Sequence, residues 1–189
     1  MGSLCDAAGY VAGVEDFGSR ENHDIEDLAQ AAAIVNWGKD FPRSSVHTAA
    51  LVRQARKRGA RVLTVSPGGD GSRSFSDRHI RLRPGSDRFL AAALIRRLFD
   101  ERRVAPEVLE RTHQPQRFQE LILKHPVDAA LAACDVARDD FDALFEVYAA
   151  VRPVATFIGA GLQRYRFGGE NVRFINALAL LSGNIGRSG

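Results

Sequence analysis

The sequence predicts an α/β protein with a doubly wound, mostly parallel, Rossmann-like sheet, flanking helices and a helical insert. Residues 34–87 carry the main evidence: a short apolar run, a helical run closed by Gly59, and a second apolar run rich in Val, which together form a βαβ unit. An alternating run at 79–83 and an apolar run at 153–158 add two further strands, each followed by a helical pattern. The resulting order of strands and helices is typical of a doubly wound sheet.

The first third of the chain leads into this unit. Residues 4–19 are rich in small residues, which allow close packing against a neighbour or a ligand and are also common in tight turns. A short helix is expected from Asp24, with acidic residues in its first turn. A strand at 33–37, a loop at 38–45 and a helix at 46–58 follow, with Ser44 or Ser45 as the N-cap. The Val-rich strand at 61–65 suits a central parallel position, covered on both faces.

The rest of the chain continues the pattern. A polar loop at 68–77 precedes an edge strand at 79–83 and a helix at 88–102. Shorter helical stretches predict an insert at about 104–138, followed by a helix at 139–151, a buried strand at 153–158 and a last helix at 170–181. We therefore expect an N-terminal segment, residues 1–24, and a Rossmann-like domain, residues 25–189.

Composition narrows the class of protein. The 189 residues are 45% hydrophobic and 26% charged, which suits one globular domain or slightly more. The net charge of +3 comes without a basic tract interleaved with aromatics, so nucleic-acid binding is not expected. Two cysteines, Cys5 and Cys134, cannot form a disulfide framework or a four-thiolate cluster, and Cys134 is expected to pack in the core.

No apolar run approaches the roughly 20 residues that a membrane span requires, and the N-terminus lacks the features of a secretory signal. A cytoplasmic location is expected, or a periplasmic one where a leader precedes the chain. Both ends of the sequence are abrupt, which predicts a piece of a longer protein.

The carboxyl ends of the strands are the expected ligand site, because open α/β sheets bind ligands just beyond those ends. The segments 37–40 and 66–70 follow two of the strands, and their Gly and Pro residues let the backbone turn sharply near a ligand. Trp37 could instead be a core aromatic side chain at a strand end.

Five short motifs occur in a fixed order along the chain. They are Trp37-Gly38-Lys39-Asp40, Ala55-Arg56-Lys57-Arg58-Gly59-Ala60, Val65-Ser66-Pro67, Ser76-Asp77 and Arg83-Pro84-Gly85-Ser86-Asp87. A later segment reads Gly159-x-Gly161-x-Gln163 and continues to Gly186. In order and spacing the chain resembles the molybdopterin oxidoreductase family, the DMSO-reductase superfamily, over nearly its whole length.

The resemblance implies a bis-molybdopterin guanine dinucleotide cofactor on molybdenum or tungsten, and a central Rossmann-like domain that holds one guanine dinucleotide. By this analogy one set of residues lines the pyrophosphate and dithiolene side: Trp37, Gly38, Lys39 and Asp40. A second set reaches the ribose and guanine: Ser66, Pro67 and Gly68. Gly85, Ser86 and Asp87 add nucleotide contacts, and Gly159 and Gln163 approach the pterin. Backbone N–H groups at such turns suit a pyrophosphate, and a carboxylate accepts hydrogen bonds from guanine.

The chain departs from the family pattern at several of these positions. Asp40 stands where Asn is usual, and Ser66 and Gly68 replace an Asp and an Arg. A carboxylate at position 40 would repel phosphate, which argues against a pyrophosphate contact through Asp40. Asp70 is an alternative guanine-facing carboxylate. Cys5 is the candidate catalytic metal ligand, since a thiolate binds a high-valent metal well. The alternative is a small buried cysteine.

Three hypotheses follow. The chain belongs to a molybdenum or tungsten oxidoreductase that acts on a small-molecule substrate with a redox partner, where the missing domains complete the cofactor site and an upstream segment holds an iron–sulfur cluster. Alternatively, it is a non-catalytic structural subunit of the same fold, which the altered residues 40, 66 and 68 favour. The third hypothesis is an unrelated nucleotide-binding module.

Overall fold

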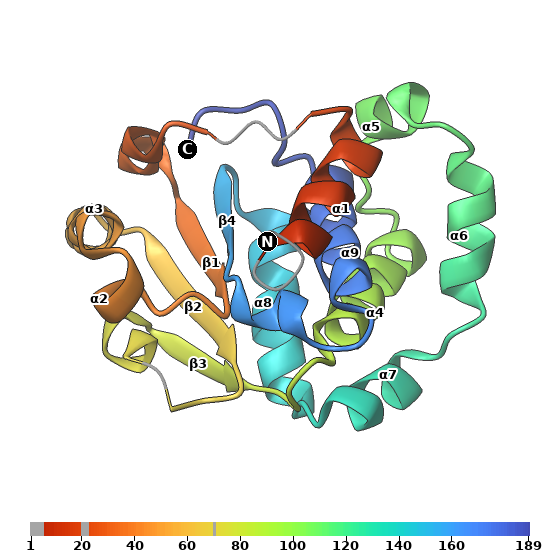
Figure 1. The fold of residues 1–189 in the computed structure, drawn as a ribbon. Helices are drawn as coiled ribbons and strands as arrows, with labels where there is room; N and C mark the ends of the chain where they lie inside the picture. Colours follow the sequence, from red (N-terminus) through yellow and green to blue (C-terminus); the bar gives the residue numbers. More distant parts are fainter. Residues whose placement is uncertain (1–5, 20–22, 70) are drawn as a thin grey trace.

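Four parallel strands form the centre of the protein. The computed structural model describes residues 6–19, 23–69 and 71–189. The strands are β1 (Ala33–Trp37), β2 (Arg61–Ser66), β3 (Arg78–Arg81) and β4 (Val154–Ile158). They pair in the order β3-β2-β1-β4, and every pair is parallel (Figure 1). The predicted doubly wound, Rossmann-like sheet is confirmed.

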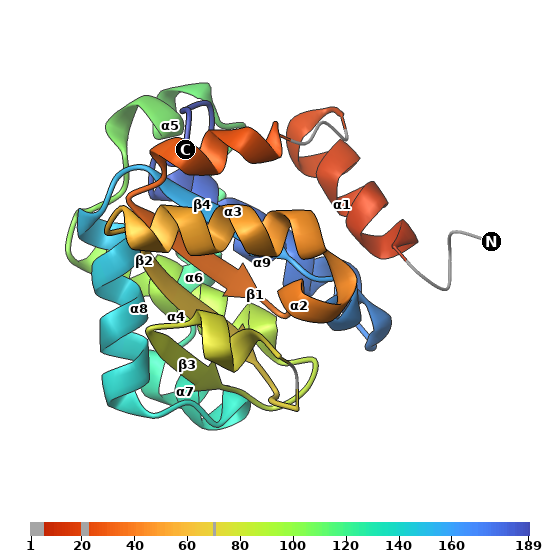
Figure 2. The ribbon, with the colours of Figure 1, turned by 90° about the vertical axis from the view of Figure 1, so that its left-hand side faces the viewer.

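One face of the sheet is covered by short elements. These are η2 (Ile25–Gln30), α2 (Phe41–Ser44), α3 (Val46–Lys57) and η3 (Ser72–Phe75). Figure 2 shows α3 lying across the strands. Ile34 and Val62 pack into this layer, whereas the next residues along the strands, Val35 and Leu63, pack into the opposite one. This alternation follows from the two-residue period of a strand and gives each face its own core.

The opposite face carries the larger core. Its helices are α4 (Asp87–Asp100), α8 (Arg138–Ala150) and α9 (Gly168–Leu181), and α1 (Ala7–Phe17) packs on α9. Three short helices, α5 (Pro106–Arg111), α6 (Pro115–Leu123) and α7 (Val127–Cys134), pack mainly against α4 and α9. They lie on the right of Figure 1, farthest from α2 and α3.

Cys134, the last residue of α7, is fully buried, so its predicted place in the core is confirmed. Burial raises the pKa of its thiol to about 11. This thiol is therefore a packing group.

Two helices were not expected from the sequence. α1 forms within the small-residue segment, where Ala8, Gly9, Ala12 and Gly13 recur at helical spacing on the side that packs against the protein. α2 adds one turn inside the predicted loop at 38–45. Ser45 does precede α3, but its hydroxyl donates to the Ser44 carbonyl instead of capping the helix. The predicted boundaries at 24 and 104–138 stay predictions.

Among the described residues, no helix has both the length and the apolar character needed to cross a membrane.

Candidate functional site

The carboxyl ends of the four strands meet at one edge of the sheet, since the strands are parallel. The loops that follow them are η3 with the residues before it, the turn at 38–40, the turn at 82–86 and the segment 159–167, which contains η4 (Gly161–Arg164). Figure 2 shows the strands running toward α2 at this edge. The edge brings together all the predicted site residues that the structure describes; Cys5 and Asp70 lie outside the described residues.

The turns after β1 and β4 touch through their backbones. Gly38 has a φ of 71°, in the region that favours glycine. Its N–H donates to the Val65 carbonyl at 2.9 Å, and the Gly159 N–H donates to the Trp37 carbonyl at 2.7 Å. A Cβ at position 159 would overlap the Gly38 carbonyl. Only glycine fits at 159, so its role in this structure is to let two chain segments approach closely.

Trp37 is a core aromatic side chain. Its indole is fully buried, and Nε1 donates to the Tyr148 hydroxyl at 3.1 Å. That hydroxyl lies 3.0 Å from the Thr156 hydroxyl, and burial raises the pKa of Tyr148 to about 12. The indole therefore braces the end of β1 and offers no surface to a ligand in this structure.

The Lys39 peptide is held on both sides by hydrogen bonds. Its N–H donates to Asn36 Oδ1 at 2.9 Å. Its carbonyl accepts from Asn36 Nδ2 at 2.8 Å and from the Ser72 hydroxyl at 2.6 Å. Because the N–H groups of Gly38 and Lys39 both donate within the protein, the expected backbone contact with a pyrophosphate has no donor at these two positions. The Lys39 ammonium, which forms no ion pair with any described residue, is the group left to meet an anion.

Asp40 is used inside the protein. Its carboxylate lies 3.1 Å from Arg43 Nη1 and accepts from the Gly71 N–H at 3.2 Å. Arg43 also donates to the Gly69 carbonyl. The carboxylate is therefore partly neutralised and links the turn after β1 to the loop after β2, which reduces the repulsion of phosphate expected from its charge.

The loop after β2 divides into a buried base and an exposed tip. The Ser66 hydroxyl is buried, lies 2.9 Å from His79 Nε2 and accepts from the Gly68 N–H at 3.2 Å. Pro67, Gly68 and Gly69 are exposed. Both glycines have positive φ, and a Cβ would meet open space at either position. The tip is thus a backbone surface without side chains above it.

The turn after β3 is largely covered. Ser86 and Asp87 are each 4% exposed, and the Ser86 hydroxyl donates to the Arg83 carbonyl at 2.5 Å. The Tyr165 ring covers Gly85, where a Cβ would lie 2.7 Å from Tyr165 Cγ. Burial raises the pKa of Asp87 to about 6, despite its place in the first turn of α4. Contact between guanine and this carboxylate stays a prediction, because little of the side chain reaches the surface.

Gln163 joins the edge to α1. Its Oε1 accepts from the Gly9 N–H at 2.8 Å, and a Cβ at Gly9 would collide with this amide. A Cβ at Gly168 would likewise collide with the backbone carbonyl of Gln163. The small-residue segment therefore packs against a neighbouring part of the protein, and an approach of Gln163 to a pterin stays a prediction.

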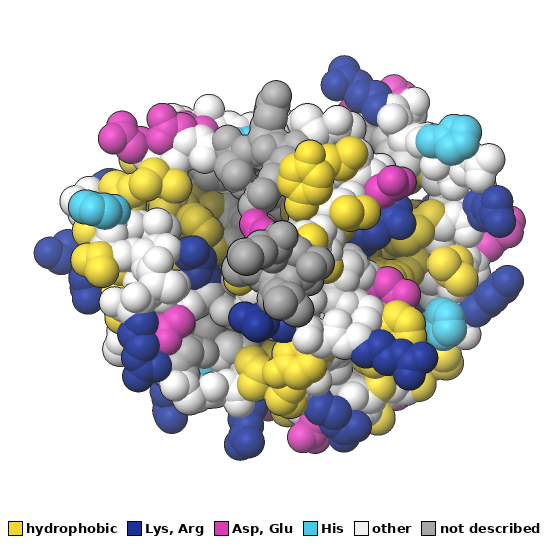
Figure 3. Space-filling view, viewed as in Figure 1, with side chains coloured by type: hydrophobic (Ala, Val, Ile, Leu, Met, Phe, Trp, Pro, Cys, Tyr) yellow, Lys and Arg dark blue, Asp and Glu magenta, His cyan; other side chains and the backbone are white. Residues whose placement is uncertain are grey.

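The edge carries excess positive charge. The segments 38–43, 66–73, 81–88 and 159–170 contain eight basic residues, Lys39, Arg43, Arg73, Arg81, Arg83, Arg88, Arg164 and Arg166. They contain four acidic ones, Asp40, Asp70, Asp87 and Glu170. Figure 3 shows Lys and Arg side chains along the lower left of the molecule, below the strand ends of Figure 1. Such an edge attracts anions.

Sequence reasoning missed the buried polar residues under this edge. Asn36 and Thr64 are fully buried and occupy the same register in β1 and β2. Asn36 Nδ2 lies 3.3 Å from the Thr64 hydroxyl, which accepts from Ser76 at 2.5 Å. A polar residue inside each of two otherwise apolar runs was the available signal.

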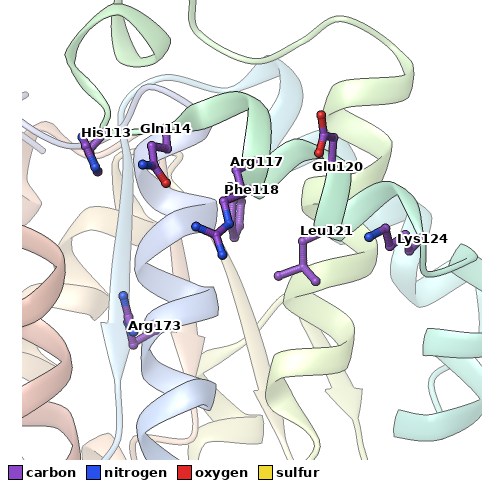
Figure 4. Close-up of a pocket in the computed structure, with 8 residues that line it drawn as sticks. All are labelled: His113, Gln114, Arg117, Phe118, Glu120, Leu121, Lys124 and Arg173. Atoms are coloured by element: carbon purple, nitrogen blue, oxygen red, sulfur yellow. The ribbon is translucent and has the colours of Figure 1, made fainter.

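A hollow of about 890 Å³ lies away from this edge, between α6 and α9. Figure 4 shows Arg117 and Leu121 of α6 pointing into it, with Arg173 of α9 on the other side. None of the predicted site residues lines it. In the described part of the chain, no group of three or more His, Cys, Asp or Glu side chains is arranged to hold a metal ion.

Comparison with known proteins identifies relatives along the whole chain. A family model described as molybdopterin oxidoreductase matches residues 2–189. The chain is 30% identical to the probable oxidoreductase YyaE of Bacillus subtilis, over all of this chain and 28% of that protein. It is 23% identical to the F420-dependent formate dehydrogenase 2 subunit alpha of Methanococcus maripaludis, over 93% of this chain and 26% of that protein.

The fold also matches a solved structure. Acetylene hydratase from Pelobacter acetylenicus superimposes with a TM-score of 0.86 at 17% identity, over all of this chain and 26% of that one. The chain thus spans about a quarter of the length of the curated relatives it matches.

Proposed function

Because the chain belongs to the molybdopterin oxidoreductase family, we propose that it holds one guanine dinucleotide of a molybdenum or tungsten bis-pterin cofactor at the carboxyl edge of its sheet. The observation that carries the proposal is that Lys39, in the turn after β1, and the open glycine tip at 68–69, in the loop after β2, lie at the same basic edge of the sheet.

The residues at this edge fit such a group. A pyrophosphate needs positive charge and close approach, which Lys39 and the side-chain-free tip offer. Pro67 and Gly68 are exposed for contact with the nucleoside, and the half-exposed Tyr165 ring beside Gly85 offers a flat apolar surface for a base. Below the exposed residues lie the buried Ser66, whose hydroxyl contacts the partly exposed His79, and the buried Asp87.

When bound, the cofactor would supply redox chemistry at its metal, while this chain's residues bind and orient its nucleotide. Cys5 remains our proposed metal ligand. We propose that the whole protein is an oxidoreductase in which further domains complete the cofactor site, an upstream segment holds an iron–sulfur cluster, and a redox partner exchanges electrons with it.

A second candidate is a structural subunit of the same fold that holds no cofactor. It is favoured by the departures from the family pattern at Asp40, Ser66 and Gly68. A generic nucleotide-binding module is the third candidate, for which only the strand–turn–helix geometry speaks.

Calorimetric titration of the 189-residue protein with GDP and with ADP tests the proposal. We expect GDP to bind at least tenfold more tightly than ADP. Lys39→Met should weaken GDP binding at least fivefold, because it removes the ammonium group that we propose meets the pyrophosphate. Lys57→Met is the matched control: this exposed lysine ends α3 and should leave the affinity within twofold.

Each alternative has its own outcome. Equal affinity for GDP and ADP would indicate the generic module. Absence of nucleotide binding, together with absence of molybdenum and tungsten in the purified full-length protein, would indicate the structural subunit and overturn the proposal.

A further inference from the structure

A buried amide lies directly beneath the proposed nucleotide edge. Asn36 is fully buried in β1, with Ile34 and Val35 before it and Trp37 after it, all with no exposed surface. A strand covered on both faces normally carries apolar residues at every position. An unpaired amide would be costly there, so its partners decide why it is tolerated.

Two of the three side-chain hydrogen bonds of Asn36 join it to the two backbone polar groups of a single residue, and the third joins it to the Thr64 hydroxyl. Its Oδ1 accepts from the Lys39 N–H at 2.9 Å, and its Nδ2 donates to the Lys39 carbonyl at 2.8 Å. One side chain therefore fixes both the N–H and the C=O of the residue that provides the free ammonium at the edge. We propose that Asn36 is the positioning residue of the nucleotide site, acting through Lys39; this inference rests on the proposed function.

The same network reaches the second loop. The Lys39 carbonyl also accepts from the Ser72 hydroxyl at 2.6 Å, and the Ser72 carbonyl accepts from Ser76 at 2.8 Å. The Ser76 oxygen also lies 2.5 Å from the hydroxyl of Thr64, which lies beside Asn36 in the sheet. The chain of contacts closes on itself, so the turn after β1 and the loop after β2 form one unit. A satisfied, partly buried network of this kind favours a single geometry of the two loops.

This arrangement assigns the roles of backbone and side chain at the edge. The Gly38 and Lys39 N–H groups donate to Val65 and Asn36, so they stabilise the turn. The ammonium of Lys39 makes the contact with the anion. The hydrogen bonds of Asn36 to the Lys39 backbone set the direction in which the Lys39 side chain leaves the backbone. Preorganisation of this kind raises affinity by lowering the ordering cost on binding.

The test compares GDP affinity in Asn36→Leu, which is close in size and removes both hydrogen bonds to Lys39 and the one to Thr64, with GDP affinity in Asn184→Leu. Asn184 is a matched control, because it is also buried and accepts from a strand N–H, that of Val154, but at the amino end of β4. At a temperature where each protein is folded by circular dichroism, we expect Asn36→Leu to weaken GDP binding about fivefold, and no more than Lys39→Met does. Asn184→Leu should stay within twofold of wild type.

A double-mutant cycle separates positioning from general loosening. If Asn36 acts through Lys39, the losses from Asn36→Leu and Lys39→Met will not add, and the double variant will bind GDP about as weakly as Lys39→Met alone. Ser72→Ala, which removes only one donor to the Lys39 carbonyl, should weaken GDP binding about threefold. It also provides the test if Asn36→Leu does not fold.

The outcomes are distinct. If wild type binds GDP and Asn36→Leu binds within twofold of it, or if the losses of Asn36→Leu and Lys39→Met add fully, the positioning role is overturned while the proposed function stands. If wild type binds no GDP, the proposed function fails and this inference with it. If Asn36→Leu does not fold, unchanged GDP affinity in Ser72→Ala overturns the proposed positioning of Lys39 through its backbone hydrogen bonds.

Discussion

The carboxyl edge of the sheet and the outer helices α5 and α6 are held by opposite means. At the edge, buried polar side chains fix the backbone of the turns at several points. The helix α5 contains no buried residue, and α6 contains a single one, Ile122. Precise hydrogen bonds impose one geometry, whereas a few apolar contacts allow local opening. The protein is therefore most constrained where we propose that it binds a ligand, and least constrained in the outer helices.

At the carboxyl edge, Gly159→Ala is the substitution that should destabilise the protein most. The new Cβ would overlap the backbone of Gly38, and neither segment is a flexible side chain that can move away. We expect a loss of about 4 kcal/mol or more in the free energy of unfolding, measured by urea denaturation. Gly161→Ala is the matched control, since nothing lies near its Cβ position, and it should change stability by less than about 0.5 kcal/mol. Equal losses in the two variants would contradict the close approach of the two turns.

The outer helices should respond locally. Ile122→Ala removes the only fully enclosed side chain of α6, which is 2% exposed, and should cost about 3 kcal/mol. Hydrogen exchange should show faster amide exchange in α6, with the protection of β1 little changed. The neighbouring Leu121→Ala, 49% exposed, should cost less than about 1 kcal/mol. Loss of protection in β1 as large as that in α6 would show that the two regions unfold together.

Asp87 lies at the carboxyl edge, at the start of α4 and near Cys134 of α7. Burial raises its pKa in the folded protein to about 6, above its ordinary value of 3.8. The folded state thus holds the proton more tightly than the unfolded state, so this residue lowers stability as pH rises from about 4 to 6. The shift corresponds to at most about 3 kcal/mol.

Asp87→Asn should remove this dependence. We expect the variant to match wild type near pH 4 and to be more stable at pH 7, measured as the free energy of unfolding across that range. Asp128→Asn, whose side chain is 90% exposed, should leave the wild-type pH profile unchanged. A variant less stable than wild type at pH 7 would mean that the ionised carboxylate contributes favourable contacts.

The main elements of the fold were predictable because their signals are local. The strands at β1, β2 and β4 are apolar runs bounded by Gly or Pro, and the long helices carry a regular apolar stripe. α1 was missed because its small side chains give weak apolar contrast, although their spacing is helical. The gathering of the predicted residues at one edge also followed from the parallel order of the strands.

Which groups are exposed at that edge was not predictable. Ser86 and Asp87, at the start of α4, lie at the expected edge, yet their side chains are buried, and for Trp37 at the end of β1 the structure selects the core alternative. Asp40 appeared as an uncompensated charge in the sequence, and its partner Gly71 is thirty-one positions away. Burial and pairing depend on neighbours brought together by folding.

The amino-acid sequence by itself determined the family, the parallel α/β fold and the edge of the sheet where function is expected, because motifs and periodicity are properties of adjacent residues. The tertiary structure alone decided that Asn36 meets both polar groups of Lys39, that Ser72 reaches the same carbonyl, and that Gly159 lies against Gly38. The Ser72 and Gly159 contacts join segments far apart in the chain, and the Asn36–Lys39 contacts, although only three residues apart, need the particular turn that the folded sheet imposes. Hydrogen bonds form only where folding brings a donor within about 3 Å of its acceptor.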